Sequence, residues 1–270
     1  MLPAALRLIH PAPASAVVIL SAALGLILLD QVGRSPDGRL LLVVLSVAGS
    51  QVATGAFNDW ADRFRDAGSR PEKPIPAGDL GPRAALAIGA AGVVTQLASS
   101  APLGGAALLF GAAATASALA YDLVLSRTAA SVLPYIVSFG LLPLWIAAGL
   151  GLPLERVVGA SLLVAPFAAA AHLANTLRDF DADAASGSRS LAQVIGRGRS
   201  RLVALALAIG VGVIVTAGLG LWGQLRPVSL GLGVIGLAAV AQGAGNARRL
   251  WYGLLLAALC WTVAWAVATG

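Results

Sequence analysis

The strongest constraint in this sequence is a series of long apolar runs with few charges inside them. A hydrocarbon core about 30 Å thick is crossed by a helix of roughly 20 apolar residues. Nine runs approach or reach that length: 14–30, 39–58, 82–100, 103–121, 130–150, 155–176, 200–221, 228–246 and 250–268. Only 11% of the 270 residues are charged, against about 25% in a soluble domain. The sequence therefore predicts an all-α, polytopic membrane protein, a bundle of nine transmembrane helices.

The positive charges predict how this bundle is oriented. When connections are assigned to alternate sides, the side with the N-terminus and the two long polar connections, 58–83 and 176–201, collects 14 of the 18 Lys and Arg residues. Positive residues accumulate on the cytoplasmic side of membrane proteins. We therefore expect an integral protein of the plasma membrane with its N-terminus and both long connections in the cytoplasm and its C-terminus outside. The net charge of +6 then records topology, and we expect no nucleic-acid partner.

The two long connections carry the same motif. An Asn and two Asp residues recur at four-residue spacing in each, and Gly-Ser-Arg follows shortly after. The first copy is Asn58, Asp62 and Asp66, and the second is Asn175, Asp179 and Asp183. On a helix, four-residue spacing places side chains on one face. Each copy therefore predicts a polar stripe that begins at the same membrane surface, and the repetition suggests one domain, 1–270, with two pseudo-repeated halves, roughly 1–121 and 130–270.

Carboxylates at the membrane are energetically costly and are usually functional. Hard oxygen ligands favour Mg²⁺, which commonly bridges one or two carboxylates to the phosphates of a substrate. Arg70, Lys73 and Arg189 follow the two motifs and are suited to phosphate oxygens. A diphosphate head beside apolar helices points to a polyprenyl diphosphate as the substrate. Loss of diphosphate leaves an allylic cation, for which aromatic rings offer a π-face; the candidates are Trp60, Tyr121, Tyr135, Phe139 and Trp145.

Taken together, the two motifs resemble those of a known family. The first copy continues as R-P-x-K-P-I-P-A-G over residues 70–78, and the second reads N-x-x-R-D-x-x-x-D from Asn175. This arrangement is similar to the UbiA superfamily of intramembrane prenyltransferases, with its nine helices and its aspartate motifs after the second and sixth. The resemblance implies Mg²⁺-dependent transfer of a prenyl group to a hydrophobic or amphipathic acceptor at the membrane. Carried onto this chain, it implies metal ligands at Asn58, Asp62, Asp66, Asn175, Asp179 and Asp183.

The resemblance also implies catalytic and diphosphate-binding residues. We expect catalytic roles for Asp62, Asp66, Asp179, Asp183 and Tyr121, and diphosphate contacts from Arg70, Lys73, Arg127 and Arg189. Many members of the family have a lysine four residues after the tyrosine that ends the fourth helix. This chain has Leu125 there and Arg127 two residues later. Either Arg127 takes over the cationic role or the phosphate end of the site differs, and we adopt the first as the working hypothesis.

Other functions stay open on the sequence. The same fold hosts terpene cyclases, which need no acceptor, and enzymes that transfer a phosphoribosyl group to a lipid phosphate. A secondary transporter is the alternative from another class, although transporter sites usually lie near the midplane of the membrane. The acceptor is not identified by the sequence, and aromatic acceptors are among the candidates. His172 and Asp122 are polar residues near the motifs. For each of them, a role toward the acceptor and a purely structural role are both open.

Overall fold

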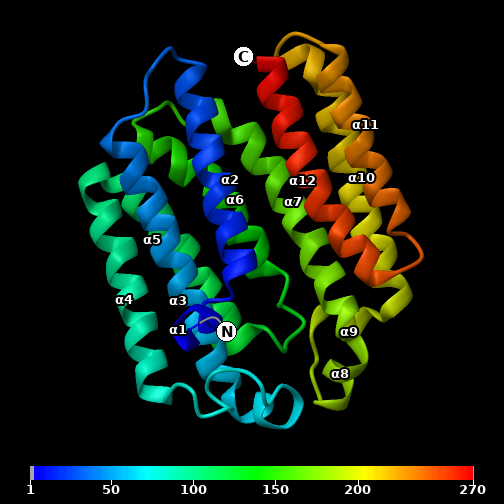
Figure 1. The fold of residues 1–270 in the computed structure, drawn as a ribbon. Helices are drawn as coiled ribbons and strands as arrows, with labels where there is room; N and C mark the ends of the chain where they lie inside the picture. The colour runs from blue at the N-terminus through cyan, green and yellow to red at the C-terminus, as the bar shows by residue number, and fades with distance from the viewer. Residues whose placement is uncertain (1–2, 270) are drawn as a thin grey trace. The chain divides into compact units, whose positions relative to one another are not determined.

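The computed structural model describes residues 3–269 and is helical, with no strand in that range. Its helices divide between two compact units, which are described one at a time (Figure 1). Unit 1 comprises residues 1–29, 34–126 and 141–161, and unit 2 comprises residues 30–33, 127–140 and 162–270. The units therefore interleave along the chain. The internal pseudo-repeat stays a prediction.

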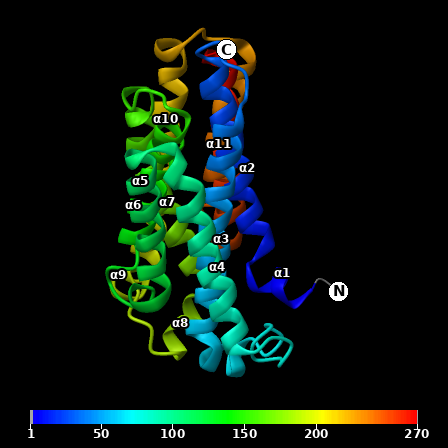
Figure 2. The same cartoon turned by 90° about the vertical axis from the view of Figure 1, so that its left-hand side faces the viewer.

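Unit 1 is built mainly from the N-terminal helices. These are α1 (Ala4–Leu8), α2 (Pro11–Asp30), α3 (Gly38–Ser69), α4 (Pro82–Ser100), the short η1 (Ala101–Leu103), α5 (Gly105–Ala120) and the π-helical turn η2 (Tyr121–Leu125). The long α3 begins at an N-cap, where the Asp37 side chain accepts a hydrogen bond from the Arg39 N–H at 2.9 Å. α4 runs alongside α3 (Figure 2).

Unit 2 contains the C-terminal helices. α6 (Leu133–Leu150) and α7 (Glu155–Arg178) each contribute a part to both units. They are followed by α8 (Phe180–Ala185), α9 (Leu191–Ile195), α10 (Arg197–Trp222), α11 (Pro227–Gln242) and α12 (Ala247–Thr269). Trp261 of α12 lies where α10 and α11 come close: its indole N–H donates to the Gly233 carbonyl at 3.1 Å. A Cβ at Gly212 or Gly236 would come within 2.3 Å of its ring.

The predicted class of fold is confirmed, with one correction to its details. Within residues 3–269, eight helices are long and apolar enough to cross a membrane. The run 228–246 forms α11, which has only 16 residues, so the count of nine holds only if this shorter apolar helix also crosses. The run 39–58 lies within α3, which has 32 residues in all and continues past Asn58 to Ser69, as the predicted helical stripe requires. At about 1.5 Å per residue, α3 is about 48 Å long, and its last turns carry the first motif beyond a core of about 30 Å.

Candidate active site

The first motif lies on the last three turns of α3, in unit 1. Asn58, Asp62 and Asp66 share one face of the helix because they are four residues apart. The predicted stripe is therefore present. Two carboxylates at this end of the helix are deeply buried: Asp66 is 2% exposed, and Asp59, at the edge of the stripe, is also 2% exposed.

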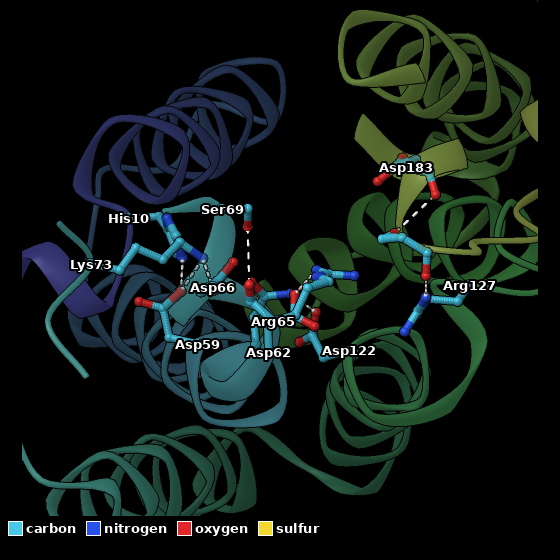
Figure 3. A network of polar contacts seen from close by, with 12 residues as sticks. His10, Asp59, Asp62, Arg65, Asp66, Ser69, Lys73, Asp122, Arg127 and Asp183 are labelled. Atoms are coloured by element: carbon cyan, nitrogen blue, oxygen red, sulfur yellow. Dashed lines mark hydrogen bonds and ion pairs between the residues drawn. The ribbon is translucent and has the colours of Figure 1, made fainter. Parts of the chain in front are cut away.

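These two buried carboxylates converge on one lysine. The Lys73 ammonium donates to Asp59 Oδ1 at 2.7 Å and to Asp66 Oδ2 at 2.8 Å. The His10 ring adds a contact from Nε2 to Asp59 Oδ1 at 3.0 Å. Figure 3 shows His10 and Lys73 reaching Asp59 from the same side. The lysine expected to bind phosphate therefore neutralises part of the first motif. His10 is a member of this cluster that the sequence did not assign to it.

The other polar residues of the stripe also have partners. Asp62 forms an ion pair with Arg65, one turn further along α3. The Asn58 amide donates to Asp122 Oδ1 at 3.1 Å, which links α3 to the turn η2. That turn closes with an N–H to carbonyl bond from Ser126 to Tyr121 at 2.9 Å, five residues apart. Single π-helical turns of this kind occur frequently at functional sites, and this one carries Tyr121 and Asp122 beside the first motif.

The connection after α3 is fixed in place by hydrogen bonds. Arg70 ends the helix, with its N–H on the Asp66 carbonyl at 2.7 Å. The Arg7 guanidinium donates to the Glu72 carbonyl at 3.1 Å and also pairs with Asp79. Leu8 is fully buried in a small core with Ala56 and Ala85, against which Trp60, Ile75, Leu80 and Ile88 pack. Residues 3–10 therefore act as a brace for the loop over residues 70–81.

The second motif, in unit 2, has the same spacing but a different backbone. α7 ends at Arg178, and Asp179 leaves helical geometry at φ −104° and ψ 15° before α8 begins. The expectation of one continuous helical stripe is therefore wrong for this copy. Asp183 still follows Asp179 by one turn, because its N–H donates to the Asp179 carbonyl at 2.9 Å. Asn175 and both aspartates are half-buried, and Asp181 is exposed and pairs with Arg197.

A strap formed by residues 127–131 holds the loop that follows this motif. The Arg127 guanidinium donates to the Ser186 carbonyl, and the Arg189 N–H donates to the Arg127 carbonyl at 2.9 Å. The Ser131 hydroxyl contacts His172 Nε2 at 3.0 Å and accepts from the Leu191 N–H at 3.2 Å. Arg127 and Arg189 are thus brought together beside the second motif. Arg189 is exposed. Two residues before it the chain turns at Gly187, whose φ of +72° is a conformation that glycine adopts without strain.

The candidate aromatic side chains are placed differently. Tyr135 stacks on Phe139 at 5.9 Å and lies against the His172 ring at 4.6 Å between centroids, in unit 2. His172 is fully buried, so its structural role in the strap is the one the contacts support. In unit 1, Trp145 is 2% exposed and packs at Gly111. Trp60 belongs to the small core beneath the brace.

The donor groups suit Mg²⁺ when a substrate supplies further oxygens. Within residues 3–269 no group of three or more His, Cys, Asp or Glu side chains is close enough to hold a metal ion. Mg²⁺ is usually held by one or two carboxylates together with water and phosphate oxygens. The first motif offers oxygen ligands on one helix face, and Asp59 Oδ2 is buried without a hydrogen-bond partner. The residues present therefore fit this ion as part of a metal–diphosphate complex.

Comparisons with known proteins identify the family. The model of the UbiA prenyltransferase family matches residues 16–245. The chain belongs to that family. Membership places it among the enzymes that transfer prenyl groups, a kind of alkyl transfer, as the sequence predicted.

A sequence relative and two solved structures are consistent with this assignment. A digeranylgeranylglyceryl phosphate synthase of Natronomonas pharaonis is 32% identical over 168 residues, which cover 60% of this chain and 58% of that protein. The matched region is thus less than two thirds of that relative's length. A solved structure concerning digeranylgeranylglyceryl phosphate synthase in membranes aligns at a TM-score of 0.76 and 18% identity, over 98% of this chain and 97% of the other.

The second structure contains ligands. A UbiA homolog from Archaeoglobus fulgidus bound to GPP and Mg²⁺ aligns at a TM-score of 0.70 and 16% identity, covering 99% of this chain and 100% of that chain. The same homolog is also known bound to DMAPP and Mg²⁺. At these identities the structural likeness establishes the fold, and the ligands belong to the homolog.

Proposed function

We propose that this chain transfers a prenyl group from a polyprenyl diphosphate to an amphipathic acceptor, in a Mg²⁺-dependent reaction within the membrane. The observation that carries the proposal is that each motif combines carboxylates with basic residues next to them. In the first motif the basic residue is Lys73, on Asp59 and Asp66. In the second motif Arg127 and Arg189 are tied to each other beside Asp183. Binding of GPP, DMAPP and Mg²⁺ by a homolog of the same fold supports the choice of ligand.

The roles of the residues follow from their chemistry. Asn58, Asp62 and Asp66 from the first motif, and Asn175, Asp179 and Asp183 from the second, are the proposed metal ligands. Bound Mg²⁺ supplies positive charge that stabilises the departing diphosphate. Arg70, Arg127 and Arg189 offer planar forks to phosphate oxygens, and Lys73 offers a compact charge. The bond that breaks joins the first prenyl carbon to a diphosphate oxygen, and the new bond joins that carbon to the acceptor.

Tyr121 is the proposed contact of the cation that forms on the prenyl carbon. It begins the turn η2, whose next residue, Asp122, is bound to Asn58 of the first motif. The aromatic ring of a tyrosine stabilises a neighbouring cation through its π-face. We therefore place the reacting carbon of the donor near this turn and the diphosphate near the motifs.

A prenylglyceryl phosphate is the acceptor we would test first. The sequence relative is a digeranylgeranylglyceryl phosphate synthase, and a similar structure concerns the same activity. Such an acceptor combines a hydrocarbon tail with an anionic head, which suits a chain whose cations gather on the side of the motifs. Aromatic acceptors form the second arm of the experiment.

We further propose that both motifs face the cytoplasm across the plasma membrane, with the N-terminus inside and the C-terminus outside. The distribution of Lys and Arg, with 14 of 18 on the side of the motifs, supports this orientation. An outside C-terminus requires α11 to cross the membrane together with the eight longer helices. Cysteine labelling from each side tests this directly.

The function is tested by incubating purified protein with Mg²⁺ and labelled prenyl diphosphates of several lengths or, in a parallel sample, labelled phosphoribosyl diphosphate, with and without acceptors. Label in a new lipid only when acceptors are present supports the transferase. A cyclic hydrocarbon or alcohol formed without acceptors identifies a cyclase, and transfer from a phosphoribosyl diphosphate identifies the third activity of this fold. Absence of diphosphate release from every donor, with transport activity insensitive to Asp62→Ala and Asp179→Ala, would overturn the proposal in favour of a transporter.

A further inference from the structure

Lys73 is the only lysine of the 270 residues, and it is buried among carboxylates. Its ammonium lies 2.7 Å from Asp59 Oδ1 and 2.8 Å from Asp66 Oδ2. The Lys73 side chain is 12% exposed, and those of the two aspartates are 2% and 3% exposed. A lysine that only awaits a phosphate would extend into solvent, because its ammonium is strongly hydrated. The position of Lys73 therefore requires an explanation of its own.

Electrostatics gives one part of that explanation. Two carboxylates taken out of water are destabilising unless a cation is close to them. One ammonium balances half of the charge of Asp59 and Asp66, and the Oδ2 atom of Asp59 is buried without a hydrogen-bond partner. The cluster therefore holds a monovalent cation where a divalent one would match its charge.

The loop that carries Lys73 gives the other part. Arg7 fixes this loop at two places, the Glu72 carbonyl and the Asp79 carboxylate. Within the loop, the Lys73 N–H donates to the Arg70 carbonyl at 3.1 Å, and the Ala77 N–H donates to the Lys73 carbonyl at 2.9 Å. The backbone on both sides of Lys73 is thus held, while its four-carbon stem can rotate. Any movement of the ammonium is then a movement of the side chain and needs no opening of the loop.

We propose that Lys73 is a built-in counter-ion of the first motif, which leaves Asp59 and Asp66 when a divalent cation arrives with the diphosphate and then binds the phosphate oxygens. This inference rests on the proposed function, since the diphosphate is the new partner of the ammonium. It predicts that the free protein resists divalent cations at this motif. It also predicts that the same lysine favours the metal–diphosphate complex.

The wild-type protein offers a direct probe of this exchange. Labelling with lysine enriched in ¹³C at Cε gives one side-chain NMR signal, because there is one lysine. In the free protein the signal should be that of an immobilised, ion-paired ammonium. Mg²⁺ with an unreactive prenyl thiolodiphosphate should move it to a second position. A signal typical of a mobile, solvated lysine, or one that does not move on addition of both ligands, would overturn the proposal.

A variant separates the two roles of Lys73 by the sign of its effects. Lys73→Gln should bind Mn²⁺ alone more tightly than wild type, by about tenfold, because the competing ammonium is gone. It should bind the Mn²⁺–thiolodiphosphate complex more weakly by a similar factor. Paramagnetic resonance of Mn²⁺ measures both affinities without any turnover. Arg83→Gln is the matched control, since it removes one positive charge from an exposed residue of the same connection and should change neither affinity.

The outcomes also distinguish this inference from the proposed function. If Lys73→Gln binds Mn²⁺ more weakly both alone and with the thiolodiphosphate, Lys73 only supports the fold. If its binding of Mn²⁺ alone is unchanged, Lys73 only contacts phosphate. Either result overturns the proposed exchange. The measurement with Mn²⁺ alone needs no prenyl donor. It can therefore succeed even if no prenyl diphosphate is turned over, in which case the proposed function fails and the counter-ion role stands.

Discussion

The two motifs share a spacing and differ in structure. The first lies on the uninterrupted helix α3, with Asp59 and Asp66 buried around Lys73. The second is interrupted at Asp179, where α7 gives way to the short α8. The first is stabilised by a brace from the N-terminus, and the second by a strap over residues 127–131. Repetition of a motif in a sequence thus predicts repetition of its chemistry better than repetition of its backbone.

The difference suggests a division of labour. In the first motif, two carboxylates already share the Lys73 ammonium, so under our proposal it exchanges that cation when it takes up a metal. The second motif has half-exposed aspartates next to exposed Arg189, so it can receive a metal–diphosphate with little rearrangement. We therefore expect the two copies to be equally necessary for the reaction and unequal in their dependence on nearby supports.

The largest effects should come from the aspartates, and they should be alike in the two motifs. Asp62→Asn and Asp179→Asn should each lower kcat/KM for diphosphate release by about 100-fold or more, because each removes a proposed carboxylate ligand of the Mg²⁺ that stabilises the departing diphosphate. Asp181→Asn is the control, since Asp181 is exposed and forms an ion pair with Arg197; it should change the rate less than about twofold. A large loss at Asp181, or none at Asp179, would break the comparison.

The strap should matter chiefly for donor binding. Arg127→Met removes the contact with the Ser186 carbonyl and the proposed contact with phosphate. It should raise KM for the prenyl diphosphate by about tenfold, the size expected for loss of a charge-assisted hydrogen bond. Arg127→Lys should restore part of that affinity. Arg199→Met, at an exposed position of α10, is the control. An unchanged KM in Arg127→Met would show that the phosphate end of this site differs from the working hypothesis.

The brace should matter chiefly for stability. A Cβ at Gly55 would lie 2.8 Å from the backbone of Ile9, so Gly55→Ala should push residues 3–10 away from α3. We expect a loss of about 1–3 kcal/mol, as for other overpacked positions, measured as a lower apparent Tm. Gly68→Ala lies on the same helix with nothing within 4 Å and should be neutral or stabilising by up to about 1 kcal/mol. Equal effects of the two substitutions would show that the brace contributes nothing.

The smallest effect concerns the hydroxyl that fastens the strap. Ser131→Ala removes a group shared by His172 and the Leu191 N–H, and it should lower stability by about 1 kcal/mol. Limited trypsin digestion should then cut sooner after Arg189 in the second loop and at an unchanged rate after the exposed Arg83, just beyond the first loop. Ser186→Ala is the control, because its exposed hydroxyl bonds only to the Asp183 carbonyl. Faster cutting at both sites would point to a general loss of stability.

Much of this molecule could be predicted from hydropathy and motif spacing. The apolar runs located the membrane helices, and four-residue spacing placed Asn58, Asp62 and Asp66 on one face. Both signals are local in sequence, and a helix converts them directly into geometry. The family followed from the same residues, because two long motifs occur in the right order on the right connections.

The rest depends on contacts between residues far apart in the chain. His10 is 49 residues from Asp59, and no periodic pattern connects them. The Ser131 hydroxyl likewise joins His172 and Leu191, which are 41 and 60 residues away, and the break at Asp179 has no counterpart in the motif spacing. One signal for the brace was present in the sequence. Among residues 1–13, Arg7 and His10 are the only basic residues, and they lie on the side predicted to hold both motifs.

The proposed function takes metal ligands from both motifs, and a double-mutant cycle tests most directly whether they serve one metal–diphosphate. The affinity of an unreactive prenyl thiolodiphosphate would be measured in Mg²⁺ for wild type, Asp62→Asn, Asp179→Asn and the double variant. A shared ligand predicts a coupling free energy above about 0.5 kcal/mol, with the second substitution costing less once the first is present. Losses that add within about 0.5 kcal/mol would mean that the motifs bind independently, and would contradict the account.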